Sequence, residues 1–135
     1  EDGIRDSSPS RGLGDVYKRQ ISRLFHAGLG HYNSKNFFDA HEVWEELWSE
    51  YYLADRKFIQ GLIQLSVSFV HLENGNVKGA KSLLKKCREK FESFSGIQRG
   101  INMKVLMESI EQVHTAYEAE DFPNDFDWNL VPVLD

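Results

Sequence analysis

The chain of 135 residues has the length of one domain, and its hydrophobic share of 41% and aromatic share of 13% exclude a globally disordered protein. Its formal net charge of −5 argues against a nucleic-acid partner or an anionic membrane surface. A single cysteine, Cys87, excludes an internal disulfide, and the longest apolar run, residues 65–72, is far shorter than the roughly 20 residues that span a bilayer. These features predict a soluble, cytoplasmic protein.

The first twenty residues differ from the rest of the chain. Residues 1–20 show no helical or strand periodicity and lack the apolar segment of a secretory signal. Residues 15–20, DVYKRQ, are what the DNA GATGTGTATAAGAGACAG encodes, and this DNA resembles the transposon end used in sequencing libraries. Residues 1–6 and 10–14 similarly resemble the rest of such an adapter. We therefore expect residues 1–20 to be a non-native, disordered leader, with the native chain beginning near Ile21.

Two helices are predicted at the start of the remaining chain. Apolar residues at helical spacing predict the first over residues 21–33. The tetrapeptide NSKN is typical of a turn, and its last residue, Asn36, can cap a second helix over residues 37–52. The second helix has a wide apolar stripe that includes Trp44 and Trp48, for which core packing is the simplest interpretation.

A third helix is predicted over residues 56–73, with Asp55 as its N-cap. Apolar residues occur all around it, which is typical of a central helix surrounded by others. Gly61 costs about 1 kcal/mol relative to alanine inside a helix, so we expect a close helix crossing there.

The rest of the chain predicts two more helices and a tail. The helix over residues 77–94 places Cys87 on its apolar face and a row of lysines and arginines on the opposite face, most simply a solvated surface. A fifth helix is predicted over residues 100–119, which closes a helical domain of residues 21–120. Two prolines exclude a helix in residues 121–135, and the aromatic residues there predict an irregular, acidic tail that packs on the bundle.

An internal similarity supports this arrangement. HYNSKNFFDA, residues 31–40, aligns with HLENGNVKGA, residues 71–80, at a period of 40 residues. Both segments join two helices through a tight turn, as in the hairpins of tetratricopeptide-type repeats. The chain is therefore predicted to be all-α: a compact bundle of about five helices, built from two stacked helical hairpins plus a fifth helix and an irregular C-terminal tail.

A group of polar residues lies in an apolar setting on the second and third predicted helices. His41 and Glu45 are neighbours on successive turns, and the spacing of Gln60, Gln64 and His71 places them on one stripe. If that stripe faces the second helix, these side chains meet in the middle of the domain. The candidate site residues are His41, Glu42, Glu45, Gln60, Gln64, His71 and Asn76.

Three interpretations of this group remain open. The first is a buried network in which each polar group has a partner. The second is a site for Zn, Mn or Fe with His41, Glu45 and His71 as ligands, although HEVWE is not the HExxH motif of zinc proteases. The third is acid–base catalysis or small-ligand binding by His41 and Glu45. No nucleotide cofactor is predicted, because no Gly-rich phosphate loop, CxxC or GxSxG motif occurs.

Three blocks, FFDAHEVWEELW, RKFIQGLIQLSVSFVH and NGNVKGAKSLL, are similar to the DUF309 family, a domain of unknown function found in small bacterial, archaeal and plastid proteins. The similarity covers about residues 21–94 and implies a compact all-α bundle with no assigned biochemistry. The residues on which it rests are His41, Glu42, Glu45, Trp48, Gln60, Gly61, Leu62, Ile63, Gln64, His71, Gly75, Asn76, Gly79 and Ala80.

The leading functional hypothesis is a binding or structural domain with a central His/Glu/Gln cluster. The alternatives are a metal-dependent or acid–base enzyme that uses His41, Glu45 and His71, and a helical-repeat-like module that binds a protein partner. Whether the chain is an enzyme stays open, as does a divalent metal. A small ligand, a protein partner or a homodimer is compatible with the sequence, whereas nucleic acid and membrane are not expected.

Overall fold

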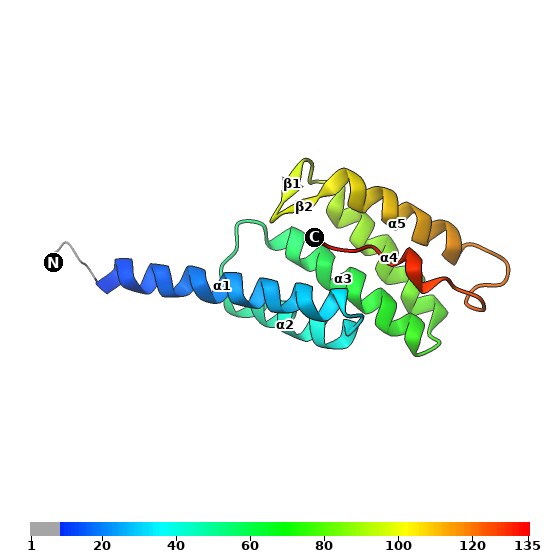
Figure 1. Cartoon of the computed structure of the whole chain (residues 1–135), viewed down its shortest axis with the longest axis horizontal. Helices are drawn as coiled ribbons and strands as arrows, with labels where there is room; N and C mark the ends of the chain where they lie inside the picture. Colours follow the sequence, from blue (N-terminus) through cyan, green and yellow to red (C-terminus); the bar gives the residue numbers. More distant parts are fainter. Residues whose placement is uncertain (1–8) are drawn as a thin grey trace.

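The computed structural model describes residues 9–135, with side chains from residue 14 onward. Most of this part of the chain is helical (Figure 1). Two strands of two residues pair antiparallel between the last two α helices. The elements are α1 (Pro9–Asn33), α2 (Phe37–Glu50), α3 (Arg56–Glu73), α4 (Val77–Phe91), β1 (Ile97–Gln98), β2 (Ile101–Asn102), α5 (Met103–Tyr117) and the 3-10 helix η1 (Trp128–Leu130).

The helices form two stacked hairpins, as the sequence predicts. α1 packs antiparallel to α2, α3 packs antiparallel to α4, and α2 lies against α3 (Figure 1). α5 packs on α4, and the segment after α5 turns back across the bundle (Figure 1). The prediction of a compact all-α bundle of about five helices is confirmed.

The two hairpins are closed by the same turn. In the first, Asn36 N donates to His31 O at 2.8 Å, and in the second, Asn76 N donates to His71 O at 2.8 Å. The residue before each asparagine has positive φ, 64° at Lys35 and 75° at Gly75. This is the Schellman pattern, in which one left-handed residue ends a helix. The two aligned decapeptides therefore share this backbone hydrogen bond as well as a similar sequence.

α3 is the central helix of the bundle, as its apolar circumference predicts. Its side chains Phe58, Ile59, Leu62 and Leu65 are fully buried. The predicted close crossing at Gly61 is confirmed, because a Cβ there would lie 2.6 Å from the ring of Phe91 on α4. A residue larger than glycine would push α3 and α4 apart.

The start of the first helix differs from the expectation. α1 begins at Pro9, so residues 9–20 are helical where irregular structure was expected, and residues 1–8 lie outside the described part of the chain. Proline fits the first position of a helix, and no second proline interrupts the segment that follows. Tyr17 packs against Tyr51 with ring centroids 5.0 Å apart. The adapter origin of these residues stays a prediction.

The region between α4 and α5 also differs. The fifth helix was expected from residue 100, but a β-hairpin occupies residues 97–102. Positive φ at Gly96, Arg99 and Gly100 turns the chain through this hairpin. The helix begins where Asn102 Oδ1 accepts from Val105 N at 3.2 Å. α2 and α4 end two and three residues before their predicted ends, at Glu50 and Phe91.

The C-terminal segment, residues 121–135, is irregular apart from η1 and lies against the helices. Val131 and Leu134 are buried, and the ring of Trp128 stacks on Phe37 with centroids 6.3 Å apart. The side chain of Asn33 bonds both the carbonyl oxygen and the amide of Leu134, at 2.8 and 3.0 Å. None of the described helices is both long and apolar enough to cross a membrane.

Candidate functional site

The polar residues predicted as one cluster fall into two groups along α2 and α3. In the first group, Glu45 from α2 and Gln60 and Gln64 from α3 line one small open cavity of about 140 Å³. Trp48 and Ile63 complete its wall. Spacings of three and four residues place these side chains on the facing sides of two antiparallel helices.

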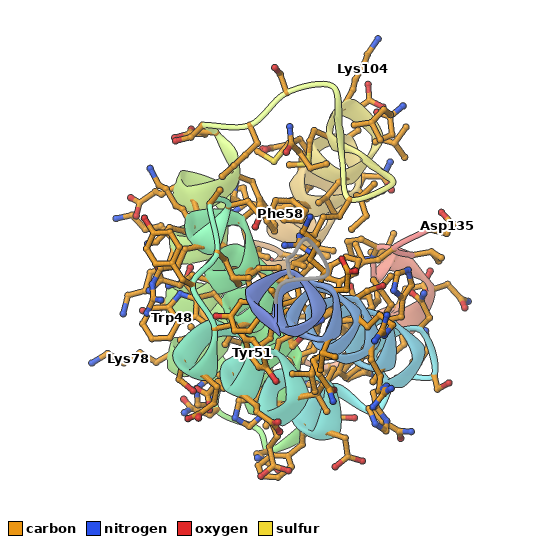
Figure 2. All side chains as sticks on the ribbon, turned by 90° about the vertical axis from the view of Figure 1, so that its left-hand side faces the viewer. Trp48, Tyr51, Phe58, Lys78, Lys104 and Asp135 are labelled. Carbon is orange, nitrogen blue, oxygen red and sulfur yellow. The ribbon has the colours of Figure 1, made fainter. Side chains whose placement is uncertain are left out.

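Trp48 lines this cavity and is half-buried, with its side chain packed against the core. Its ring is covered on one face by the guanidinium of Arg56, whose Cζ lies 3.8 Å from the ring centroid. Figure 2 shows Trp48 at the flank formed by α2 and α3, on the side away from Asp135. The sequence predicts that Trp48 packs in the core, and its side chain does pack against the core but stays partly exposed.

Two polar atoms on residues that line the cavity lack partners. Within the described part of the chain, Trp48 Nε1 and Gln64 Oε1 are buried and make no hydrogen bond. One is a donor and the other an acceptor. Buried polar groups without a partner are rare in folded proteins, and leaving one unpaired costs about 1–3 kcal/mol. Two residues that line the cavity therefore each carry a buried polar atom without a partner.

His41 stands next to Glu45 on α2, with its Nε2 3.7 Å from Glu45 Oε1. Its Nδ1 lies 2.6 Å from the carbonyl oxygen of Phe38. Because a carbonyl oxygen only accepts, Nδ1 carries the proton, and Nε2 keeps its lone pair in the neutral imidazole.

The prediction that this group meets in the middle of the domain is wrong. The side chain of Glu45 is 59% exposed and that of His41 is 18% exposed. The pair lies at the outer edge of the α2–α3 interface, where water solvates the carboxylate. A sealed, fully satisfied network is therefore not present at Glu45.

The second group is at the turn between α3 and α4. Asn76 Oδ1 accepts from Gly79 N at 2.9 Å and caps α4, and this bond fixes which end of the amide carries the nitrogen. Asn76 Nδ2 lies 3.3 Å from His71 Nδ1. Since the amide nitrogen only donates, His71 Nδ1 accepts. A Cβ at Gly79 would lie 2.6 Å from Asn76 Nδ2, so these three residues form one tightly fitted turn.

A comparison with known families gives the same assignment as the motifs. The chain matches the family described as Domain of unknown function (DUF309) over residues 25–83. Residues 25–83 are a DUF309 domain. The matched range contains both hairpin turns and every candidate site residue, and the predicted resemblance is confirmed. A comparison with curated proteins gave no match.

The residues predicted to bind a metal are not assembled into one ligand set. Among residues 9–135, no group of three or more His, Cys, Asp or Glu side chains is placed to hold one ion. His41 and Glu45 are adjacent, but His71 belongs to the turn group, and Glu42 is exposed and lies outside both groups. The predicted ligands His41, Glu45 and His71 therefore do not converge.

A buried polar contact of the bundle was not predicted from the sequence. The hydroxyl of Ser68 donates to the carbonyl oxygen of Ala80 at 2.7 Å and lies 2.9 Å from the hydroxyl of Tyr117. Serine in an apolar helix gives only a weak signal of such a bond. Cys87 lies in the core nearby, as predicted, and its burial raises the pKa of the thiol far above the usual range. That thiol is not a nucleophile in the folded chain.

Proposed function

We propose that this DUF309 domain is a binding module whose α2–α3 cavity takes an amide-bearing ligand, such as the main chain of a peptide. The observation that supports the proposal is a pair of buried, unpaired atoms on two residues that line the cavity, the Trp48 Nε1 donor and the Gln64 Oε1 acceptor. An amide group has one N–H and one C=O, so it can satisfy both atoms at once.

The size of the cavity limits what it holds. Cavities for drug-sized ligands measure about 300–1,000 Å³, whereas this one is about 140 Å³. It is large enough for a single amide group but not for a whole nucleotide or sugar. Ile63 supplies an apolar wall, and Glu45 and Gln60 supply further hydrogen-bonding groups at the rim. A chain that extends beyond the cavity would lie along the α2–α3 edge.

The proposal is tested by titrating the full chain, labelled with ¹⁵N, with N-methylacetamide. We expect a saturable shift of the Trp48 indole N–H signal. Methyl acetate, which lacks the N–H donor, should bind about two- to tenfold more weakly, the equivalent of one hydrogen bond. Gln64→Leu should weaken binding of N-methylacetamide by a similar factor. Gln112→Leu, an exposed glutamine on α5, is the matched control and should bind like the unchanged chain.

Two results would contradict the proposal. One is the absence of any saturable shift with N-methylacetamide. The other is equal affinity for N-methylacetamide and methyl acetate in the unchanged chain, since the N–H would then contribute nothing.

A second candidate is acid–base catalysis, because His41 Nε2 keeps its lone pair beside Glu45, which lines the cavity. The same samples distinguish it from binding alone. A binding module leaves N-methylacetamide intact, whereas a hydrolase releases acetate and methylamine, both visible by proton NMR. Loss of these products in His41→Ala, with binding retained, would assign the general base.

A further inference from the structure

A second cavity lies where the turn between α3 and α4 meets the C-terminal segment. Its volume is about 380 Å³, and Leu72 and Glu73 at the end of α3 form one side. Asp125, Phe126 and Trp128 of the C-terminal segment also line the cavity. Figure 1 shows this segment after α5 folding back over the bundle. The cavity shares no lining residue with the α2–α3 cavity.

Two aromatic rings meet at a right angle in the wall of this cavity. The rings of Phe126 and Trp128 have centroids 5.2 Å apart and an interplanar angle of 84°. Trp128 is held in place because it also stacks on Phe37. The faces of aromatic rings have negative electrostatic potential and attract cations, and perpendicular rings provide two such faces.

The charged side chains around the cavity are also negative. Two acidic residues, Glu73 and Asp125, are among the lining residues of the cavity, and no lysine or arginine is. The sequence from Val105 to Asp135 contains eight acidic residues and no lysine or arginine. Partial burial raises the pKa of Glu73, so its carboxylate is incompletely solvated and would be stabilised by a positive charge nearby.

The same segment already accepts a cation elsewhere. Lys81 Nζ lies 5.7 Å from the ring centroid of Phe122, within the range of a cation–π contact. The tail aromatics are thus placed to interact with ammonium groups, and at Phe126 and Trp128 such a group would come from outside the chain.

We propose that the cavity between Glu73 and Trp128 binds an organic cation through an alkylammonium or guanidinium head group. The two rings contact the apolar surface of the cation, and the two carboxylates neutralise its charge. The site does not depend on the function proposed for the α2–α3 cavity.

The test uses tetramethylammonium chloride and methylguanidinium chloride as probes on the ¹⁵N-labelled full chain, with the Trp128 indole signal as readout. We expect a saturable shift with at least one of these cations. The uncharged tert-butanol, of similar shape to tetramethylammonium, should give none at the same concentration. Glu73→Gln and Asp125→Asn should each weaken binding about two- to fivefold, as expected for one partly exposed charge contact.

Asp121→Asn is the matched control, since it removes the same charge from the same segment but does not line the cavity. It should leave the affinity unchanged. Equal losses in Asp121→Asn and Asp125→Asn would overturn the proposal, because the effect would then be a diffuse field. Absence of a shift with both cations would also overturn it. Comparing spermidine with an acetylated lysine methylamide then separates a free amine from a side chain on a partner protein.

Discussion

Gly28 on α1 sits directly against the indole of Trp44, a fully buried side chain on α2. A Cβ at this position would overlap the indole ring, whose Nε1 donates to Phe25 O at 3.2 Å. We predict that Gly28→Ala lowers the free energy of unfolding by about 1–3 kcal/mol, the usual cost of overpacking a core. Gly30→Ala is the control, because nothing lies within 4 Å of the added carbon.

The control substitution should instead raise stability by about 0.5–1 kcal/mol, since alanine is a better helix former than glycine. Urea unfolding of both variants measures the difference. Equal stabilities would show that α1 and α2 do not approach as closely as the structure has them.

For single residues, the sequence predicts the role of a residue type better than the direction in which its side chain points. Gly61 was expected at a close crossing because glycine inside an apolar helix needs a packing reason, and the ring of Phe91 supplies it. Trp48 packs against the core, as its place on the apolar stripe predicts, yet its place at the cavity depends on where α3 lies. Asn76 was expected at the site, and its capping of α4 became evident only from the turn geometry.

Among the elements, the β-hairpin is connected to the start of α3 by a hydrogen-bonded ion pair. Arg99 Nε lies 2.5 Å from Asp55 Oδ2, and a second guanidinium nitrogen lies 2.9 Å from Oδ1. Both side chains are about three-quarters buried, at 25% and 24% exposure. The side chain of Asp55, expected to cap α3, makes no capping bond and holds Arg99 instead.

We predict a coupling energy of about 1.5–3 kcal/mol between Arg99→Ala and Asp55→Ala in a double-mutant cycle, because both hydrogen bonds join charged groups. The surface pair Arg88–Glu111, with Glu111 58% exposed, is the comparison and should give about 1 kcal/mol or less. Thermal or urea unfolding of the six variants and the unchanged chain supplies both cycles. If the two couplings were equal, the hairpin would not be fixed to α3 by this contact.

The elements that could be predicted are those with a repeated signal. Residues 56–73 form a helix with the bounds expected, since apolar residues recur over several turns and a turn sequence precedes them. The hairpin could not be predicted, because strands of two residues have no periodicity and the positive φ of Arg99 has no sequence signature.

For the whole molecule, the sequence predicts the order of the helices but not how deeply the candidate site is buried. Antiparallel packing of α2 and α3 was enough to predict that Glu45 approaches Gln64. His71 lies two turns beyond Gln64, where the chain turns into α4, and there Asn76 holds it. Whether Glu45 is buried depends on how far α4 covers the α2–α3 edge, which is a tertiary property without a local pattern.

The C-terminal segment runs from the end of α5 back to α1, and Leu134 holds it there. The Leu134 side chain is 1% exposed, and its backbone is bonded on both sides by Asn33 of α1, whereas the neighbouring Val133 is 68% exposed. We predict that Leu134→Ala costs about 2–5 kcal/mol, the usual loss for a buried leucine. Val133→Ala should change stability by less than about 0.5 kcal/mol.

The free energy of unfolding of a domain is about 5–15 kcal/mol, so the loss in Leu134→Ala would be plain in the urea midpoint. The two variants remove similar apolar groups from adjacent positions, and only one of these groups is buried. Equal midpoints would mean that the segment does not dock in solution. A large difference would show that the last residues stabilise α1, although they lie outside the residues matched to the family.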